Sequence, residues 1–348
     1  MGVALASLVV AGSVLAACGG GAGGGSGTAA GGSGGTAEGI TLYNGQHVQT
    51  THALVGAFEK ATGIAVHVRS DDESTLAVQI LAEGGRSPAD VVYTENSPPL
   101  EVLAGKGLLT HVPAATLSRV PPRFDSPEGD WVGVSARVSV LVYNTGLVKP
   151  SDLPTSVLQL AGARWKGRLA LAPGETDFQP IVTSVDRAVG PAATLRWLDA
   201  LKANAAGHVY PDNETVTADV NKGQASIGVI NEYYWYRLKA QLGSAAMHSA
   251  IAYFAPRDPG YVVDVSGAAV LRSSRHRASA ERFLSFLTSR RAQEIIAHSD
   301  SFEYPLADGV TTHATKTPFA QLQPNPIGVA ALGTGAAAVR LLQEAQLL

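Results

Sequence analysis

From Ile40 onward, the chain alternates between short β-rich runs and segments whose apolar residues recur at helical spacing. The strand-like runs cover residues 40–43, 64–68, 90–93, 134–143, 168–171 and 225–230. The helical pattern covers residues 53–62, 76–83 and 193–203. This alternation is typical of an α/β architecture with mostly parallel sheets. About 310 residues follow the amino-terminal segment, more than one such core usually holds, so we expect two lobes.

The amino terminus is predicted to be a signal peptide. Residues 1–17 are apolar and small, too few to span a membrane, and they end at Leu15-Ala16-Ala17, directly before Cys18. Leu-Ala-Ala-Cys is similar to a bacterial lipobox, in which the cysteine is lipidated and becomes the first residue of the mature chain. The first Lys or Arg is Lys60, so the basic segment that opens a signal peptide would have to precede Met1. The alternative is that Cys18 is a buried structural cysteine.

The composition limits how such a chain is held together and what it binds. Cys18 is the only cysteine in 348 residues, so an exported fold has no disulfide framework and must rest on a large core. Residues 19–38 are almost entirely Gly, Ala, Ser and Thr, which predicts a flexible tether and a folded part that starts near Gly39. The net charge of −3 gives no electrostatic case for binding nucleic acid.

Unusual side chains follow three of the predicted strands. His47 comes shortly after the run at 40–43, Glu95 after the run at 90–93, and the adjacent Tyr233 and Tyr234 after the run at 225–230. Ligands of α/β proteins bind where strands end and loops lead into helices. One imidazole, one carboxylate and two phenols would therefore converge if these loops face a common cleft.

Such a donor set suits ferric iron. Oxygen donors with one nitrogen favour a hard cation, whereas zinc favours His and Cys, and calcium an all-oxygen cage. A phenol has a pKa near 10, so only a strongly acidic ion removes its proton at neutral pH. Two phenolates and one carboxylate supply three negative charges, which match a trivalent ion. The alternative is that adjacent tyrosines are core and rim residues of a helix, and that His47 is a hydrogen-bonded loop residue.

From Ile40 onward, the chain also resembles the bacterial periplasmic ferric-ion-binding proteins, or bacterial transferrins. Two segments are specific to that family: Asn44-Gly45-Gln46-His47 and Tyr233-Tyr234-Trp235-Tyr236. Others are shared more widely among solute-binding proteins: Pro88-Ala89-Asp90-Val91, Trp165-Lys166-Gly167, Ser266-Gly267-Ala268-Ala269-Val270-Leu271 and Glu303-Tyr304-Pro305-Leu306. Residue by residue, the family's iron ligands fall on His47, Glu95, Tyr233 and Tyr234.

The resemblance implies a two-lobed periplasmic-binding-protein fold of class II, with a hinge and an interlobe cleft. We expect residues 39–138 and 264–314 to form one lobe, and residues 139–263 and 315–348 the other. The hinge strands should include parts of 134–143 and 261–271, where the chain crosses between lobes. The family fills the two remaining positions of an octahedral ferric ion with water and a small anion such as carbonate or phosphate. Asn213 and Asn231 match positions that help to hold this anion.

One segment departs from the family pattern. Where the family has a loop rich in Ser, Gly and Ala that offers backbone N–H groups to the anion, this chain has Pro173-Gly174-Glu175-Thr176-Asp177. One interpretation is that acidic side chains here stabilise the first turn of a helix. The other is that Glu175 or Asp177 occupies the place of the anion and ligates iron directly. Arg137 is either a further anion partner or a buried structural arginine.

These observations predict a binding protein rather than an enzyme. The sequence holds no His-Glu-x-x-His motif and no phosphate-cradling Gly-rich loop after a strand, and its Gly-x-Ser-x-Gly match at residues 31–35 lies in the Gly-rich tether, where no strand precedes it to form a nucleophile elbow. We expect a monomeric, extracytoplasmic lipoprotein, anchored to the cell membrane at Cys18, that passes ferric iron to an ABC-transporter permease. The alternative is a protein of the same fold that binds another solute, such as a polyamine, an organophosphonate or an iron chelate.

Overall fold

The computed structural model describes residues 39–307, 309–311 and 317–348. The predicted signal peptide, Cys18 and the tether at 19–38 lie outside the described residues. Within the described ranges, no helix combines the length and the apolar character that crossing a membrane requires.

The described strands form one sheet. In chain order they are β1 (Ile40–Gly45), β2 (Val66–Ser70), β3 (Val91–Thr94), β4 (Val132–Asn144), β5 (Leu169–Ala170), β6 (Ile227–Asn231), β7 (Ser249–Ala252), β8 (Val263–Val270) and β9 (Tyr304–Pro305). Their spatial order is β2-β1-β3-β8-β4-β6-β5, and β7 and β9 both pair with β4. The six predicted strands all exist, with ends shifted by at most two residues, whereas β7 and β9 were not predicted.

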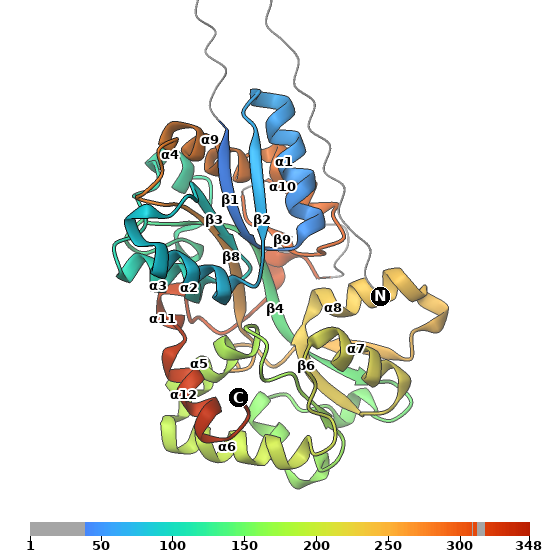
Figure 1. Ribbon diagram of the computed structural model, residues 1–348. Helices are drawn as coiled ribbons and strands as arrows, with labels where there is room; N and C mark the ends of the chain where they lie inside the picture. Colours follow the sequence, from blue (N-terminus) through green and yellow to red (C-terminus); the bar gives the residue numbers. More distant parts are fainter. Residues whose placement is uncertain (1–38, 308, 312–316) are drawn as a thin grey trace, which may run out of the picture. The chain divides into compact units, whose positions relative to one another are not determined.

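The long strand β4 joins the two halves of the fold. Its residues from Val132 to Val138 pair with β8, and those from Ser139 to Tyr143 pair with β6. Figure 1 shows β4 running from the group of β1, β2, β3 and β8 toward β6. All 13 residues of β4 are buried, which explains its nearly unbroken apolar sequence. A two-lobed arrangement, with β4 common to both lobes, is therefore confirmed.

The prediction that the sheet is mostly parallel is wrong. Only β1–β2, β1–β3 and β5–β6 are parallel, whereas β4 is antiparallel to each of its partners and β3 is antiparallel to β8. An alternating strand pattern carries no information on strand direction, because side chains point to opposite faces with a period of two either way. The central strands β4 and β8 are those that connect the halves, and they run in opposite directions.

The described helices flank this sheet. They are α1 (Val48–Thr62), α2 (Glu73–Glu83), α3 (Ser97–Gly105), α4 (Ala114–Leu117), α5 (Phe178–Val189), α6 (Pro191–Asn204), α7 (Asn213–Lys222), α8 (Glu232–Leu242), α9 (Arg277–Leu287), α10 (Arg290–Ala297), α11 (Val329–Leu332) and α12 (Ala336–Glu344). The carboxyl-terminal α12 packs against α5 and α6.

Three short connections create the polar centre of the fold. α1 begins three residues after β1 ends, α3 begins three residues after β3 ends, and α8 follows β6 directly. Gly45, the last residue of β1, allows this close packing, because a Cβ atom there would lie 2.6 Å from the Cβ of Glu73 in α2. The helix starts therefore meet next to β4, at the ends of β1, β3 and β6.

Candidate functional site

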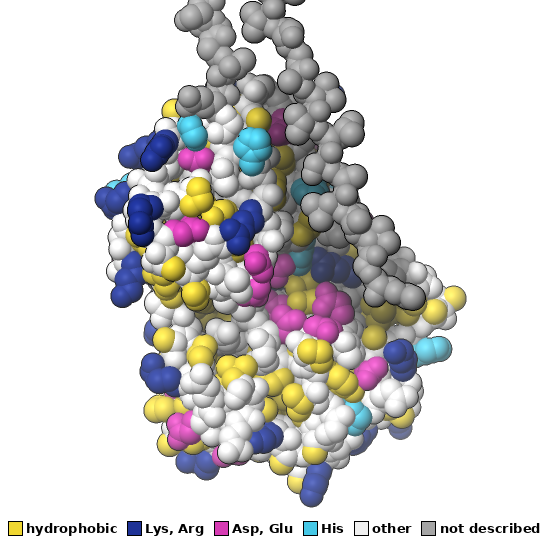
Figure 2. All heavy atoms as spheres, in the orientation of Figure 1, with side chains coloured by type: hydrophobic (Ala, Val, Ile, Leu, Met, Phe, Trp, Pro, Cys, Tyr) yellow, Lys and Arg dark blue, Asp and Glu magenta, His cyan; other side chains and the backbone are white. Residues whose placement is uncertain are grey.

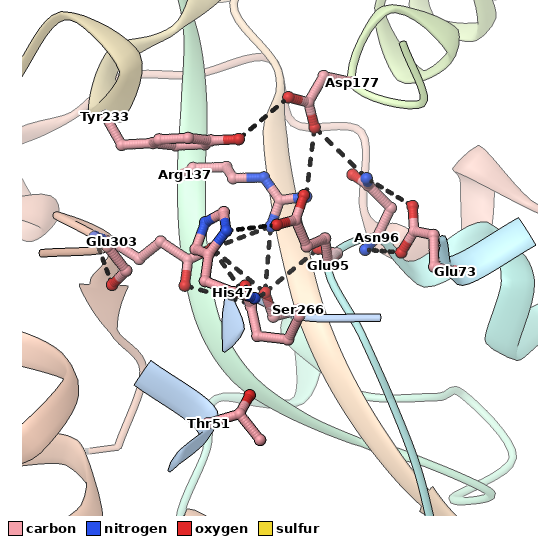
Figure 3. A network of polar contacts seen from close by, with 12 residues as sticks. His47, Thr51, Glu73, Glu95, Asn96, Arg137, Asp177, Tyr233, Ser266 and Glu303 are labelled. Carbon is pink, nitrogen blue, oxygen red and sulfur yellow. Dashed lines mark hydrogen bonds and ion pairs between the residues drawn. The ribbon is translucent and has the colours of Figure 1, made fainter. Parts of the chain in front are cut away.

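The four residues predicted from the strand ends lie together. His47 Nδ1 is 2.6 Å from Glu95 Oε1, and the His47 ring meets the Tyr233 ring edge-on, with centroids 5.2 Å apart. The rings of Tyr233 and Tyr234 are 4.1 Å apart between centroids. His47 and Glu95 come from the β1 and β3 side of β4 and the tyrosines from the β6 side (Figure 3). The loops after β1, β3 and β6 thus bring these four side chains together, as predicted, whereas their role as metal ligands stays a prediction.

Asp177 completes this centre. The hydroxyl groups of Tyr234 and Tyr233 both donate to Asp177 Oδ2, at 3.0 and 3.4 Å. Asp177 stands at the N-cap position of α5, but its carboxylate does not cap the helix, and the first turn of α5 contains no acidic residue. The interpretation that acids here stabilise the start of the helix stays a prediction, because a carboxylate at the N-cap lies next to the positive end of the helix dipole even without a capping hydrogen bond. Asp177 is turned toward the tyrosines, and Glu175 remains half-buried beside it.

Arg137 binds the carboxylates on both sides of β4. Its guanidinium is fully buried and lies 3.3 Å from Asp177 Oδ1 and 3.1 Å from Glu303 Oε1. It also donates to Ser266 Oγ at 3.1 Å. Ser135 Oγ donates to the same Glu303 carboxylate at 2.9 Å. Arg137 is thus buried, and its partner on the tyrosine side is the Asp177 carboxylate.

Burial favours the uncharged form of each candidate ligand, which is the unprotonated form of His47 and the protonated form of Glu95 and of the two tyrosines. It lowers the pKa of His47 to about 4 and raises the pKa of Glu95 to about 7, although Arg137 favours the Glu95 carboxylate. Burial and the charge of Asp177 raise the pKa of both Tyr233 and Tyr234 well above 10. A cation that binds at this centre must therefore displace phenolic protons.

The two asparagines that were predicted to hold an anion, Asn213 and Asn231, lie at the starts of two different helices. Asn213 is buried at the start of α7, where its backbone oxygen accepts a bond from Thr217, and no hydrogen bond of the described residues joins its side chain to the tyrosines. Asn231 is buried at the start of α8. Its side chain favours the ionised form of Asp264, while burial raises the pKa of Asp264 to about 8.

Asn96 makes a second polar contact across the centre, which the sequence analysis did not predict. The Asn96 side chain donates to Thr176 Oγ1 at 3.0 Å, and to Asp177 Oδ1 at 3.4 Å. The Glu73 carboxylate holds Asn96 in place by accepting from its backbone N–H at 2.8 Å and its side-chain amide at 2.9 Å. Burial raises the pKa of Glu73 to about 7. The adjacency of Asn96 to Glu95 was the one available signal.

A cavity of about 610 Å³ leads from the surface to this centre. His47 and Tyr234 form part of its wall, together with residues of α7, α8 and the segment after α10. Figure 2 shows acidic side chains concentrated near the middle of the visible face. Burial, reinforced by Asp177 and Glu214, raises the pKa of the nearby Glu175 to about 8. The charged residues that line the cavity itself are the acids Glu214 and Asp300 and the base Arg237.

The donor atoms limit which metals the centre suits. Among the described residues, no group of three or more His, Cys, Asp or Glu side chains is arranged to hold a metal ion. A metal at this centre would therefore have to use the oxygen atoms of Tyr233 and Tyr234. Phenolate donors suit a hard, strongly acidic cation and not a soft, thiolate-seeking one.

Comparisons with known proteins agree with this geometry. Residues 44–299 match the family model described as bacterial extracellular solute-binding protein. An Fe(3+)-binding periplasmic protein of Serratia marcescens is 38% identical, over 89% of this chain and 91% of the relative. A major ferric iron-binding protein of Neisseria meningitidis is 37% identical, over 88% of this chain and 92% of the relative.

Solved structures are similar over nearly the same span. The crystal structure of iron-bound HitA from Pseudomonas aeruginosa has a TM-score of 0.83 and 41% sequence identity, covering 88% of this chain and 98% of that one. A Trichodesmium protein in complex with iron and citrate has a TM-score of 0.78 and 28% identity, with the same coverage.

Replacing Glu175 by Gln should change how the stability of the metal-free protein depends on pH. The folded chain holds the Glu175 proton up to a pKa of about 8, whereas the ordinary value is 4.5. Ionisation of Glu175 therefore destabilises the folded state progressively as the pH rises through this window. We expect Glu175→Gln to raise the urea midpoint at about pH 9 and to leave it unchanged at about pH 4. An equal change at both pH values would contradict this assignment.

Proposed function

The chain belongs to the bacterial extracellular solute-binding proteins and, within them, to the periplasmic ferric-ion-binding proteins, and on this basis we propose that it captures ferric iron outside the cytoplasm and delivers it to an ABC-transporter permease. Its relatives are binding and transport proteins, so the chain is not an enzyme. The observation that carries the proposal is the pair of adjacent buried phenols facing His47 and Glu95 across β4.

The proposed iron ligands are His47, Glu95, Tyr233 and Tyr234. Their proximity supports this set, since His47 Nδ1 lies 2.6 Å from Glu95 Oε1 and the rings of His47 and Tyr234 both lie against the Tyr233 ring. The raised pKa of both tyrosines supports a ferric ion, because a weakly acidic cation could not remove their protons at neutral pH. A metal-free solute such as a polyamine or an organophosphonate would have no use for two adjacent phenols.

Asp177 is proposed as a fifth ligand that takes the place of the family's small anion. Both tyrosine hydroxyl groups already donate to its carboxylate, which supports Asp177 over Glu175. Two phenolates and two carboxylates carry four negative charges, one more than a ferric ion neutralises. The buried guanidinium of Arg137, 3.3 Å from Asp177, offsets the fourth charge. Carbonate or phosphate near Asn213 and Asn231 is the alternative source of this donor.

Release is proposed to follow from opening of the lobes and from protonation. His47 and Glu95 lie on one side of β4 and the tyrosines on the other, so rotation about the hinge would separate the donors. Protonation of phenolate and carboxylate lowers metal affinity, because only the deprotonated groups bind. The lobe boundaries of the sequence analysis, near residues 138, 263 and 314, stay part of this proposal.

Membrane attachment through a lipid at Cys18 is also proposed, with the monomeric domain held by the tether at 19–38. The small residues before Cys18 support it. When the full chain is expressed in bacteria, the protein should partition into the detergent phase of a Triton X-114 extract, and Cys18→Ser should move it to the aqueous phase. Detergent-phase partition of both forms would rule out lipidation at Cys18.

The ferric assignment predicts a coloured complex. A titration of residues 39–348 with ferric nitrilotriacetate should give a tyrosinate charge-transfer band that saturates at one iron per chain. Substituting both tyrosines, Tyr233→Phe and Tyr234→Phe, should remove the band and weaken binding by more than about 100-fold, since even groups behind a metal ligand contribute 10–100-fold. If the unsubstituted domain gives no such band with phosphate or carbonate present, the ferric assignment is wrong, and a metal-free solute becomes the favoured ligand.

The role of Asp177 predicts independence from added anions. Iron binding should remain tight in buffer stripped of carbonate and phosphate, and Asp177→Asn should make it depend on one of them. Glu175→Gln is the matched control, because it removes a neighbouring acid without touching the tyrosines, and it should stay independent of anions. The measurement is equilibrium competition with a chelator, with and without phosphate. Strict anion dependence of the unsubstituted protein would refute the assignment of Asp177.

A further inference from the structure

A short segment between α10 and β9 spans the two sides of the centre without using a proposed iron ligand. We call residues 300–303 the strap. Arg237 Nε, in α8, donates to the backbone oxygen of Asp300 at 3.1 Å. The Phe302 ring stacks on Tyr236 of α8, with centroids 6.1 Å apart and planes 23° apart. Glu303 binds Arg137 at 3.1 Å. Three of four consecutive residues therefore contact groups that hold the tyrosine side in place.

The strap is held in a conformation that its sequence disfavours. Phe302 has a φ of 57°, in the left-handed region where a bulky residue is an outlier. Hydrogen bonds within the segment fix the turn: Ser301 N–H donates to Ser299 Oγ, and Glu303 N–H donates to Ser301 Oγ. Backbone conformations of this kind persist only where the surroundings determine them. The stacking on Tyr236 supplies one of these constraints.

Arg237 links the strap to the proposed ligands. Its guanidinium lies over the Tyr233 ring, 4.5 Å from the centroid, and 3.7 Å from the Glu214 carboxylate. One side chain thus contacts both the face of a proposed iron ligand and the strap backbone. Lys239, on the same helix, lies over the Trp235 ring at 5.1 Å and makes no hydrogen bond to the strap in the described structure.

The strap also forms part of the wall of the cavity that reaches the tyrosines. Asp300, Ser301 and Phe302 line this cavity, opposite residues of α7, and His47 and Tyr234 are exposed to the same space. A competing chelator that reaches the metal through the cavity would pass between the strap and α8. A strap released from α8 would leave this route wider.

We propose that Arg237 is a positioning residue which, by anchoring the strap, holds the two tyrosines against His47 and limits the exchange of bound iron through the cavity. This inference rests on the proposed ferric function. A different role for Arg237 would be purely electrostatic, since a cation over the ring of Tyr233 favours its phenolate. The two roles differ in what they require: the strap needs the planar Nε–H donor of arginine, whereas charge alone is also supplied by lysine.

The first test measures how fast iron leaves the loaded protein. Iron-loaded protein is mixed with excess EDTA, and loss of the charge-transfer band is followed by stopped flow. We expect Arg237→Met and Arg237→Lys to accelerate iron loss about tenfold, as for loss of one charge-assisted hydrogen bond, with the band maximum unshifted. Lys239→Met is the matched control and should leave the rate unchanged. If Arg237→Lys loses iron at the same rate as the unsubstituted protein, the effect of Arg237 is due to its charge, and the proposal that it acts by anchoring the strap is wrong.

The second test needs no iron, so its failure is separate from failure of the ferric function. Hydrogen exchange of the metal-free protein should be faster at residues 299–303 in Arg237→Met than in Lys239→Met. Phe302→Ala, which removes the stacking partner of Tyr236, should have a similar effect. In the double variant, the effects of Phe302→Ala and Arg237→Met on the rate of iron loss should be less than additive, because both substitutions act on the same segment. Unchanged exchange in both strap variants would overturn the inference.

Discussion

The buried guanidinium of Arg137 is the interaction on which the rest of this centre depends. A charge removed from water is costly unless it is paired and its hydrogen-bond donors are satisfied. The two terminal nitrogens of Arg137 pair with Asp177 on one side of β4 and with Glu303 and Ser266 on the other, whereas its buried Nε–H has no acceptor among the described residues. Because β4 belongs to both halves of the fold, the pairing fixes Asp177 relative to the end of the strap as well as to the tyrosines.

The sequence predicted the site better than the sheet. His47, Glu95, Tyr233 and Tyr234 could be singled out because each closely follows the end of a strand. The sequence did not show that β6 runs opposite to β1 and β3, so that these strand ends meet from opposite sides along β4 rather than at one edge. The sequence left two candidate acids, Glu175 and Asp177, because which of them turns toward the tyrosines depends on the packing of α5. Glu303, Glu73 and Arg237 gave no local signal, because their roles arise from burial against segments more than 20 residues away in sequence. Strand direction failed for a similar reason: a period of two is the same for parallel and antiparallel pairs.

Burial disfavours charge on every candidate ligand of the centre. It raises the pKa of both phenols and of Glu95, so that the phenols keep their protons at neutral pH, and it lowers the pKa of His47, whose imidazole stays neutral. Metal binding and proton release are therefore two descriptions of one equilibrium. In the proposed ferric complex, the burial that disfavours the free phenolates would also exclude water from them, so affinity for iron and sensitivity to acid would have a common physical origin.

The length of β4 also restricts how this protein can change over evolutionary time. Successive side chains of a strand face opposite sides, so the loss or gain of a single residue within β4 would turn the following side chains to the wrong face unless a β-bulge absorbed it, as the register shift between Gly133 and Ser135 does in the present strand. Arg137 would then point away from Asp177, or the residues that pair with β6 would lose their register. Surface loops of related chains can lengthen and shorten freely, whereas an insertion or deletion inside this 13-residue strand would separate the two halves of the binding centre in one step.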